Sequence, residues 1–195
     1  MKGKIMRASI QLFDSQGYSE TSIQDIVDAI GVTKGSFYYY YKSKQELLKD
    51  IHLNYIEGLL EKQEQILGDA DKGSKDKLYS IIYMVISSIR TQRQSARIFN
   101  REGRNLDETH TEEIRQKRQK FRLEVQKMIE EGIDRGEFKP GLRADILTFG
   151  ILGMTNWSFY WFNPEGELSE EELAGIYMDT FLNGIGNEMA GAYQK

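Results

Sequence analysis

The sequence predicts an all-α fold of about nine helices, in which an N-terminal helix-turn-helix domain of three helices precedes a larger helical domain. Three observations support this prediction. Apolar residues recur at spacings of three and four along most of the chain, and strand-like alternation never extends beyond a few residues. Capping-box pairs, a Ser followed three positions later by an acidic residue, mark several helix starts. The two prolines, Pro140 and Pro164, lie near Gly in short polar stretches typical of turns.

The first three predicted helices are short. Ile5, Ala8 and Phe13 belong to an amphipathic helix that Gly17 ends. Thr21 or Ser22 caps a second helix, with Gln24 and Asp25 placed for a capping box, and Gly31 ends it. Thr33 caps a third helix that continues to Tyr40.

A long helix then begins at the capping-box pair of Ser43 and Glu46 and runs to about Leu67, before an Asp- and Gly-rich loop from Gly68 to Gly73. We expect the functional boundary after residue 45, so that 1–45 is the helix-turn-helix domain and 46–195 a ligand-binding and dimerisation domain. The later helices are expected at Lys75–Arg93, Ala96–Arg104, Thr111–Arg135, Arg143–Phe162 and Glu170–Asn187.

Composition and charge exclude several classes of protein. With 39% hydrophobic and 29% charged residues the chain can build a core, and without cysteine it has neither disulfides nor thiolate zinc sites. We therefore expect a cytoplasmic protein with no metal or cofactor. The longest apolar run, 149–162, is too short to cross a bilayer, so no membrane partner is expected.

The net charge of −4 argues against a protein that coats nucleic acid by charge alone. Residues 1–50 carry seven Lys and Arg against six Asp and Glu, a net of +1, so the remainder carries −5. This weak asymmetry has the sign expected of a DNA-contacting N-terminal domain.

The segment from Thr21 to Lys44 is the most informative part of the chain. Two short helices joined around Gly31 form a helix-turn-helix, whose second helix enters the major groove of DNA. Lys34 suits a guanine edge, and the tyrosines suit contacts with the sugar-phosphate backbone. Ser43 and Lys44 lie where a phosphate could meet a helix N-terminus. Phe37 and Tyr41, four residues apart, are expected to face the core.

Residues 5–48, ending in GVTKGSFYYYYKSKQELL, closely resemble the N-terminal DNA-binding domain of the TetR family of transcriptional regulators. The resemblance includes Phe13, Gly17, Thr21, Ile26, Gly31 to Gly35, Tyr38, Lys44 and Leu47. It implies a homodimer that binds a near-palindromic operator, usually as a repressor that a small ligand releases. Matched by position, the implied DNA contacts are Ser22, Gln24, Thr33, Lys34, Gly35, Ser36, Tyr38, Tyr39, Tyr40 and Lys44. Tyr41 departs from the Phe more common in the family, and Tyr39 and Tyr40 stand where His or Asn is more usual, so the operator sequence cannot be predicted.

Arginines are concentrated in the second domain, where ten of eleven lie between Arg90 and Arg143. Five of them are spaced so that a continuous helix would place them on one face: Arg90, Arg93, Arg97, Arg101 and Arg104. Arg115, Arg118 and Arg122 repeat the spacing. Such rows can bind an anion, or they can form a solvated face with acidic partners such as Glu102, Glu108 and Glu112. We take Arg97, Arg101 and Arg104 as candidate ligand contacts.

An aromatic cluster at the end of the eighth expected helix either lines a ligand pocket or belongs to the core or a dimer interface; it contains Trp157, Tyr160, Trp161 and Phe162, with Met154. We take Trp157, Tyr160 and Trp161 as further candidate ligand contacts. The stretch NWSFYWFNPEGELSEEELAGIY also resembles, within residues 149–185, a TetR subgroup that governs fatty-acid and steroid-ring catabolism and responds to acyl-CoA thioesters. This resemblance implies an acyl-CoA effector.

The family resemblance also implies that the last two helices pair with their copies in a second subunit. Four glycines would allow close helix approach there: Gly150, Gly153, Gly175 and Gly184.

Two rival functions remain open at this point. In the first, the ligand-binding domain senses cationic drugs. Such a pocket would need carboxylates among its aromatic residues, and none occurs between Asp145 and Glu165. A helical-bundle enzyme would need catalytic or metal-binding groups, but His52 and His110 are the only histidines and neither has a partner at metal-ligand spacing.

Overall fold

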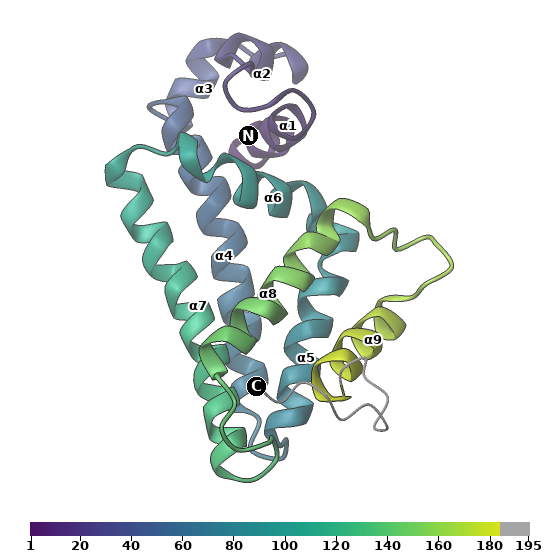
Figure 1. Ribbon diagram of the computed structural model, residues 1–195. Helices are drawn as coiled ribbons and strands as arrows, with labels where there is room; N and C mark the ends of the chain where they lie inside the picture. The colour runs from purple at the N-terminus through teal and green to yellow at the C-terminus, as the bar shows by residue number, and fades with distance from the viewer. Residues whose placement is uncertain (184–195) are drawn as a thin grey trace. The chain divides into compact units, whose positions relative to one another are not determined.

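The computed structural model describes residues 1–183 (Figure 1). They form nine α-helices and one short 3-10 helix, and no strand occurs among them. The all-α prediction is therefore confirmed. The expected end of the last helix at Asn187, and Gly184 as a close-approach residue, lie outside the described part of the chain.

The chain divides into two compact units. The first unit contains Met1–Gln65 and Ser88–Leu123, and the second contains Ile66–Ser87 and Glu124–Lys195. Two long helices, α4 (Lys44–Gly68) and α7 (Glu108–Asp134), contribute to both units. The expected functional boundary after residue 45 concerns which part binds DNA, and it stays a prediction.

The N-terminal helices of the first unit are α1 (Lys2–Gln16), α2 (Ile23–Ala29) and α3 (Lys34–Tyr40). Gly17 ends α1 with a φ of 97°, a backbone conformation that side chains other than glycine rarely adopt. Ser22, not Thr21, caps α2: its hydroxyl accepts from the Asp25 amide at 3.1 Å, and Asp25 accepts from the Ser22 amide at 2.7 Å. The Thr21 hydroxyl donates to the Gly17 carbonyl instead.

A continuous apolar core holds these helices to the start of α4. Phe13 of α1, Ile26 of α2 and Phe37 of α3 are all fully buried, together with Leu47 of α4. Truncating one such buried Phe to Ala costs about 3–5 kcal/mol in typical cores. The orientation of α3 is therefore set by one buried face, which leaves the opposite face available.

The first unit is completed by α6 (Ile89–Arg101), the 3-10 helix η1 (Glu102–Asn105) and the first part of α7. Cross-links between α4 and α7 join Lys49 to Glu113 at 2.8 Å and Glu57 to Lys117 at 3.0 Å. The pairs advance together along both helices, so α4 and α7 run in the same direction here.

The expected break between the fifth and sixth helices was placed wrongly. It falls at Ser88, between α5 (Ser74–Ser87) and α6, and not before Ala96. Ser88 is buried, and the neighbouring Ser87 hydroxyl donates to the Met84 carbonyl. A serine hydroxyl that bonds a backbone carbonyl competes with the hydrogen bonds of the helix, and serine therefore favours helix ends.

The second unit contains α5, the later part of α7, α8 (Ala144–Trp161) and α9 (Glu170–Asn183). Helix α5 packs against both α8 and α9. A hydrogen bond of 2.8 Å between Ser158 and the Tyr177 hydroxyl ties α8 to α9, and both side chains are buried. As expected, Pro140 and Pro164 lie in the turns on either side of α8.

Candidate nucleic-acid interface

The turn between α2 and α3 is closed by backbone hydrogen bonds. The Gly31 amide donates to the Asp28 carbonyl at 3.2 Å, and the Val32 amide donates to the Val27 carbonyl at 3.0 Å. Gly31 has a φ of 66°, which lets the chain reverse between the helices. Thr33 then caps α3, with its side-chain oxygen 3.3 Å from the Ser36 amide. The first unit thus contains the helix-turn-helix that the sequence predicts.

The exposed face of α3 carries most of the residues expected to contact DNA. Tyr38 and Tyr39 are 53% and 81% exposed, and Thr33, Lys34 and Gly35 are exposed as well. No hydrogen bond or ion pair engages the Lys34 ammonium within the described chain. These side chains form a polar, aromatic surface of the size of one helix face.

The opposite face of α3 is in the core. Phe37 and Tyr41 are 0% and 1% exposed, which confirms the expectation that they face inward. Ser36 and Tyr40 lie between the two faces and are half-buried. The Tyr40 ring is held edge-on by Tyr39, with ring centroids 4.8 Å apart.

Ser22 and Gln24 lie exposed at the start of α2, but both already have partners. The Ser22 hydroxyl caps the helix by accepting from the Asp25 amide, and the Ser22 amide, which donates to the Asp25 carboxylate at 2.7 Å, holds the pKa of that carboxyl below its usual range. Gln24 donates to Asp28 at 2.7 Å. The predicted DNA contacts of Ser22 and Gln24 stay predictions.

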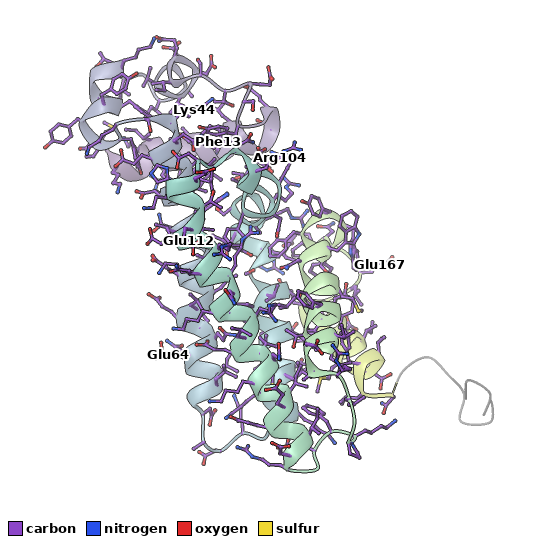
Figure 2. All side chains as sticks on the ribbon, turned by 60° about the vertical axis from the view of Figure 1, so that its left-hand side comes forward. Phe13, Lys44, Glu64, Arg104, Glu112 and Glu167 are labelled. Atoms are coloured by element: carbon purple, nitrogen blue, oxygen red, sulfur yellow. The ribbon has the colours of Figure 1, made fainter. Side chains whose placement is uncertain are left out.

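Lys44 does not present its ammonium to solvent as a phosphate anchor would. Its Nζ donates to the carbonyls of Tyr18 and Thr21 at 2.8 and 2.7 Å and lies 4.2 Å from the centre of the Tyr18 ring. Figure 2 labels Lys44 among the side chains of the first unit. Burial lowers the pKa of this ammonium. In this structure Lys44 ties the loop between α1 and α2 to α4, and its contact with DNA stays a prediction.

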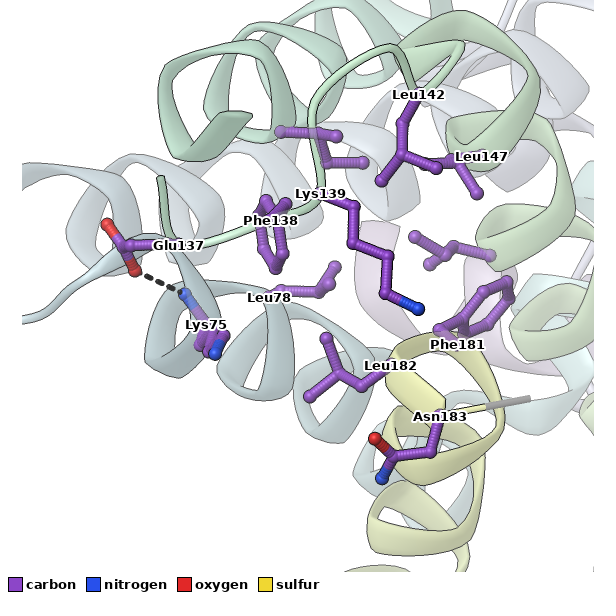
Figure 3. Close-up of a pocket in the computed structure, with 12 residues that line it drawn as sticks. Lys75, Leu78, Glu137, Phe138, Lys139, Leu142, Leu147, Phe181, Leu182 and Asn183 are labelled. Carbon is purple, nitrogen blue, oxygen red and sulfur yellow. Dashed lines mark hydrogen bonds between the residues drawn. The ribbon is translucent and has the colours of Figure 1, made fainter. Parts of the chain in front are cut away.

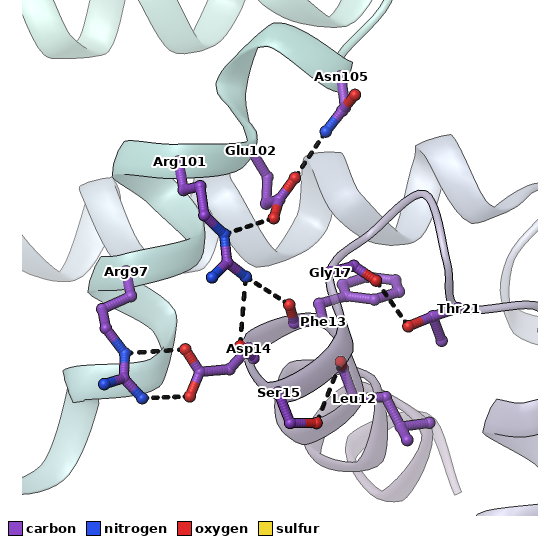
Figure 4. Close-up of polar contacts among 10 residues, drawn as sticks. All are labelled: Leu12, Phe13, Asp14, Ser15, Gly17, Thr21, Arg97, Arg101, Glu102 and Asn105. Atoms are coloured by element: carbon purple, nitrogen blue, oxygen red, sulfur yellow. Dashed lines mark hydrogen bonds and ion pairs between the residues drawn. The ribbon is translucent and has the colours of Figure 1, made fainter.

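Two arginines of the row on α6, Arg97 and Arg101, contact other residues of the protein and do not form the free anion site that was one of the two expectations. Arg97 pairs with Asp14, and Arg101 donates to the Phe13 and Asp14 carbonyls at the end of α1 and to Glu102 (Figure 4). The alternative of acidic partners is confirmed for Glu102 and also for Glu112, which pairs with Arg115. Arg104 is exposed, and no partner for it occurs among the described residues.

The sequence did not indicate that Asp14 is the partner of Arg97, because the two residues are 83 positions apart. The signal that could have suggested it is local. Asp14 lies in the last turn of α1, where an acidic side chain is unfavourable unless a cation compensates it.

Trp157, Tyr160 and Trp161 lie on the outward face of α8, with exposed fractions of 65%, 43% and 49%. The same face continues toward the start of the helix through Gly153 and Gly150 to Phe149 and Ile146, all exposed. A stripe of large apolar side chains interrupted by two glycines is typical of a helix that packs against another helix. Contact of the three aromatic residues with a ligand stays a prediction.

Comparison with known proteins agrees with this geometry. Residues 5–51 match the model of bacterial regulatory proteins of the tetR family, and residues 71–185 match the model of the tetracyclin repressor-like C-terminal domain. The chain belongs to the TetR family of bacterial regulatory proteins.

Individual members of the TetR family are similar over nearly the whole chain. The transcriptional repressor KstR2 of Mycolicibacterium smegmatis is 26% identical over 189 residues, which cover 94% of this chain and 90% of the relative. Among solved structures, the regulator PfmR of Thermus thermophilus has a TM-score of 0.86 at 25% identity, covering 94% of this chain and 99% of PfmR. AibR, solved with isovaleryl coenzyme A and operator DNA, has a TM-score of 0.84 at 22% identity, covering 93% and 97%.

The relatives are transcriptional regulators, and the N-terminal helix-turn-helix of this TetR-family chain is its DNA-binding part. Along the described residues, no helix combines the length and apolar character needed to cross a bilayer.

Proposed function

We propose that this protein is a transcriptional repressor that binds a palindromic operator as a homodimer and dissociates from it when a small effector binds. The exposed face of α3 carries the proposal. It displays a cation without a described partner, Lys34, beside the hydroxyl-bearing rings of Tyr38 and Tyr39, while Phe37 fixes the helix from behind. The similar KstR2 is named as a repressor, and its likeness extends over both domains.

In this proposal the residues of α3 divide into two roles. Lys34, at the N-terminal end of the helix, reaches the base edges, where a guanine offers two acceptors. Tyr38 and Tyr39 donate to phosphates and pack on sugars, contacts that position the helix without reading sequence. Thr33, Gly35, Ser36 and Tyr40 complete the surface. Lys44 acts indirectly, by holding the loop that precedes α2. Because operator DNA is the partner, we place the protein in the cytoplasm.

The proposed dimer uses the outward face of α8 together with α9. Seven exposed positions share this face of α8: Ile146, Phe149, Gly150, Gly153, Trp157, Tyr160 and Trp161. On α9, Ile176 is 52% exposed. The glycines let a second α8 approach closely, and burying the aromatic rings would supply the association energy.

We propose an acyl-CoA thioester as the effector, supported by AibR, whose structure contains isovaleryl coenzyme A. Arg104 is exposed and available for a phosphate. Arg97 and Arg101 hold α6 on α1, so a ligand phosphate that competes with Asp14 for Arg97 would loosen the attachment of α1 to α6. A different apolar effector is the second candidate, because the exposed aromatic residues of α8 do not specify a CoA head group.

Selection of duplexes from a random DNA pool tests the proposed function. We expect recovered sequences to contain an inverted repeat whose half-sites lie about one helical turn apart, because two copies of α3 must enter successive major grooves. Adding a long-chain acyl-CoA should then release the recovered duplex. Recovery of no common sequence would overturn the proposed operator binding, whereas release failure alone would overturn only the proposed effector.

A further inference from the structure

The second unit contains a cavity of about 480 Å³ that none of the predicted ligand contacts lines (Figure 3). Its wall comes from α5, α7, α8, α9 and the connection between α7 and α8. The floor is formed by Leu78, Ile129 and Ile151, all buried. Leu147 and Phe181 form part of the sides. This volume lies within the range of small-molecule sites, which are mostly apolar with few polar groups.

Two lysines line this cavity, Lys75 and Lys139, and the second enters the apolar space. Figure 3 shows the Lys139 side chain running into the cavity, with its ammonium toward Phe181 and Leu182. No hydrogen-bond or ion-pair partner of Lys139 occurs in the part of the chain that the structure describes. An ammonium at the edge of an apolar cavity attracts an anion more strongly than it would in bulk water.

Among the described residues of the cavity wall, the single carboxylate already has hydrogen-bond partners. Glu137 Oε2 accepts from the Lys75 amide at 3.2 Å, at the first turn of α5. Hydrogen bonding to the Ser74 backbone, together with that to Lys75, holds the pKa of Glu137 below its usual range. The Glu137 charge is therefore balanced by backbone amides at a helix N-terminus, and Lys139 remains available for an incoming anion.

We propose that this cavity binds an aliphatic carboxylate, with the alkyl chain on the floor of Leu78, Ile129 and Ile151 and the carboxylate on the Lys139 ammonium. A cationic ligand would meet Lys139 unfavourably, and a neutral chain would leave its charge unused. The proposal concerns binding to the second unit and is independent of operator recognition by α3 and of an effector held by Arg97 or Arg104.

Calorimetric titration of the full chain with octanoate and decanoate, below the concentrations at which they form micelles, tests the proposal. We expect one site per chain and about tenfold tighter binding for decanoate, because two further methylene groups leave water. Decanol has the same chain without the charge, so it should bind about tenfold more weakly than decanoate.

Two variants and one control locate the site. Lys139→Met keeps the apolar stem and removes the charge, so it should weaken decanoate about tenfold and leave decanol unchanged. Leu147→Phe fills part of the cavity and should weaken both ligands. Lys127→Met is the control, because Lys127 is also on the surface, 75% exposed on α7, and does not line the cavity.

The difference in affinity between decanoate and decanol is measured on the natural chain and on Lys139→Met. It therefore tests the proposal even if Leu147→Phe folds poorly. Equal binding of decanoate and decanol to the natural chain would overturn the proposal. The proposal would also be overturned if Lys139→Met and Lys127→Met changed the affinity for decanoate equally, or if neither ligand bound.

Discussion

Arg97 of α6 holds Asp14 of α1 through two parallel contacts: Arg97 Nε lies 2.8 Å from Asp14 Oδ1, and Arg97 Nη2 contacts Asp14 Oδ2 (Figure 4). One turn further along α6, Arg101 Nη2 donates to the Phe13 carbonyl at 2.6 Å. A guanidinium at the last carbonyls of a helix is favourable because the helix dipole is negative there. The two arginines therefore attach α6 to the end of the first helix.

Replacing Asp14 by Asn should lower the free energy of unfolding by about 1–3 kcal/mol, because Arg97 loses the charge of a carboxylate that is almost fully buried. Urea denaturation measures the change. Glu131→Gln is the control: Glu131 is 45% exposed and pairs with Arg135, and its loss should cost about 0–1 kcal/mol. Equal effects of the two substitutions would show that the Arg97–Asp14 pair contributes no more than a surface pair.

His52 should make the protein less stable in mild acid. It is fully buried, its ring packs edge-on against Phe99, and burial, with the nearby Arg118 guanidinium, lowers its pKa from 6.5 to about 4. The unfolded chain binds a proton at about pH 6.5 and the folded chain only near pH 4. The stabilisation is therefore complete above pH 6.5 and is lost as the pH falls toward 4.

Between pH 7 and pH 5 this linkage amounts to about 2 kcal/mol. We expect the free energy of unfolding of the natural chain to fall by that much more than that of His52→Leu, which carries no titrating group at this position. Parallel pH dependence of the two proteins would contradict the assignment.

Substitution of Gly132 should destabilise the protein, because the Phe138 ring occupies the space that a side chain at this position would need. A Cβ at Gly132 would lie 2.4 Å from the Phe138 ring and 2.8 Å from Ser74 Cβ. Gly132→Ala is therefore expected to destabilise the protein by about 1–3 kcal/mol. Gly58→Ala is the matched control, because Gly58 lies within α4 with open space around it; it should stabilise by about 0.5–1 kcal/mol. Thermal unfolding of both variants gives the signs, and a stabilising Gly132→Ala would be inconsistent with the packing described.

The aromatic face of α8 should control the oligomeric state. We expect the natural chain to sediment as a dimer at micromolar concentration and Trp157→Glu to sediment as a monomer, because a charge would be buried at the centre of the interface. Leu123→Glu places the same charge at a 42% exposed position of α7 and should remain dimeric. A dimeric Trp157→Glu would instead favour a ligand-contact role for Trp157.

Local signals were sufficient to predict the N-terminal helices. Ser22 with Asp25, and Gly17 and Gly31 at positive φ, act through neighbours within a few residues, so the helix boundaries follow from the sequence. The inward orientation of Phe37 follows in the same way from helical spacing.

Contacts between distant residues could not be predicted in this way. The sequence places Arg97 and Arg101 in a row, but only the fold brings Asp14 to them, and Lys44 finds carbonyls more than twenty residues away. The cavity around Lys139 needs five segments to be placed together, and no periodicity reveals it. The aromatic residues of α8 were equally compatible with a pocket and a surface until their exposure was known.

The most direct test of operator recognition by α3 is the affinity of the natural chain, Tyr38→Ala and Lys34→Ala for the selected operator and for a scrambled duplex, measured over a range of salt. We predict that the logarithm of the binding constant falls linearly with the logarithm of the salt concentration. Tyr38→Ala should lose affinity for both duplexes, and Lys34→Ala should lose about 1–3 kcal/mol of discrimination between them. Affinity and discrimination unchanged in both variants would contradict operator recognition by α3.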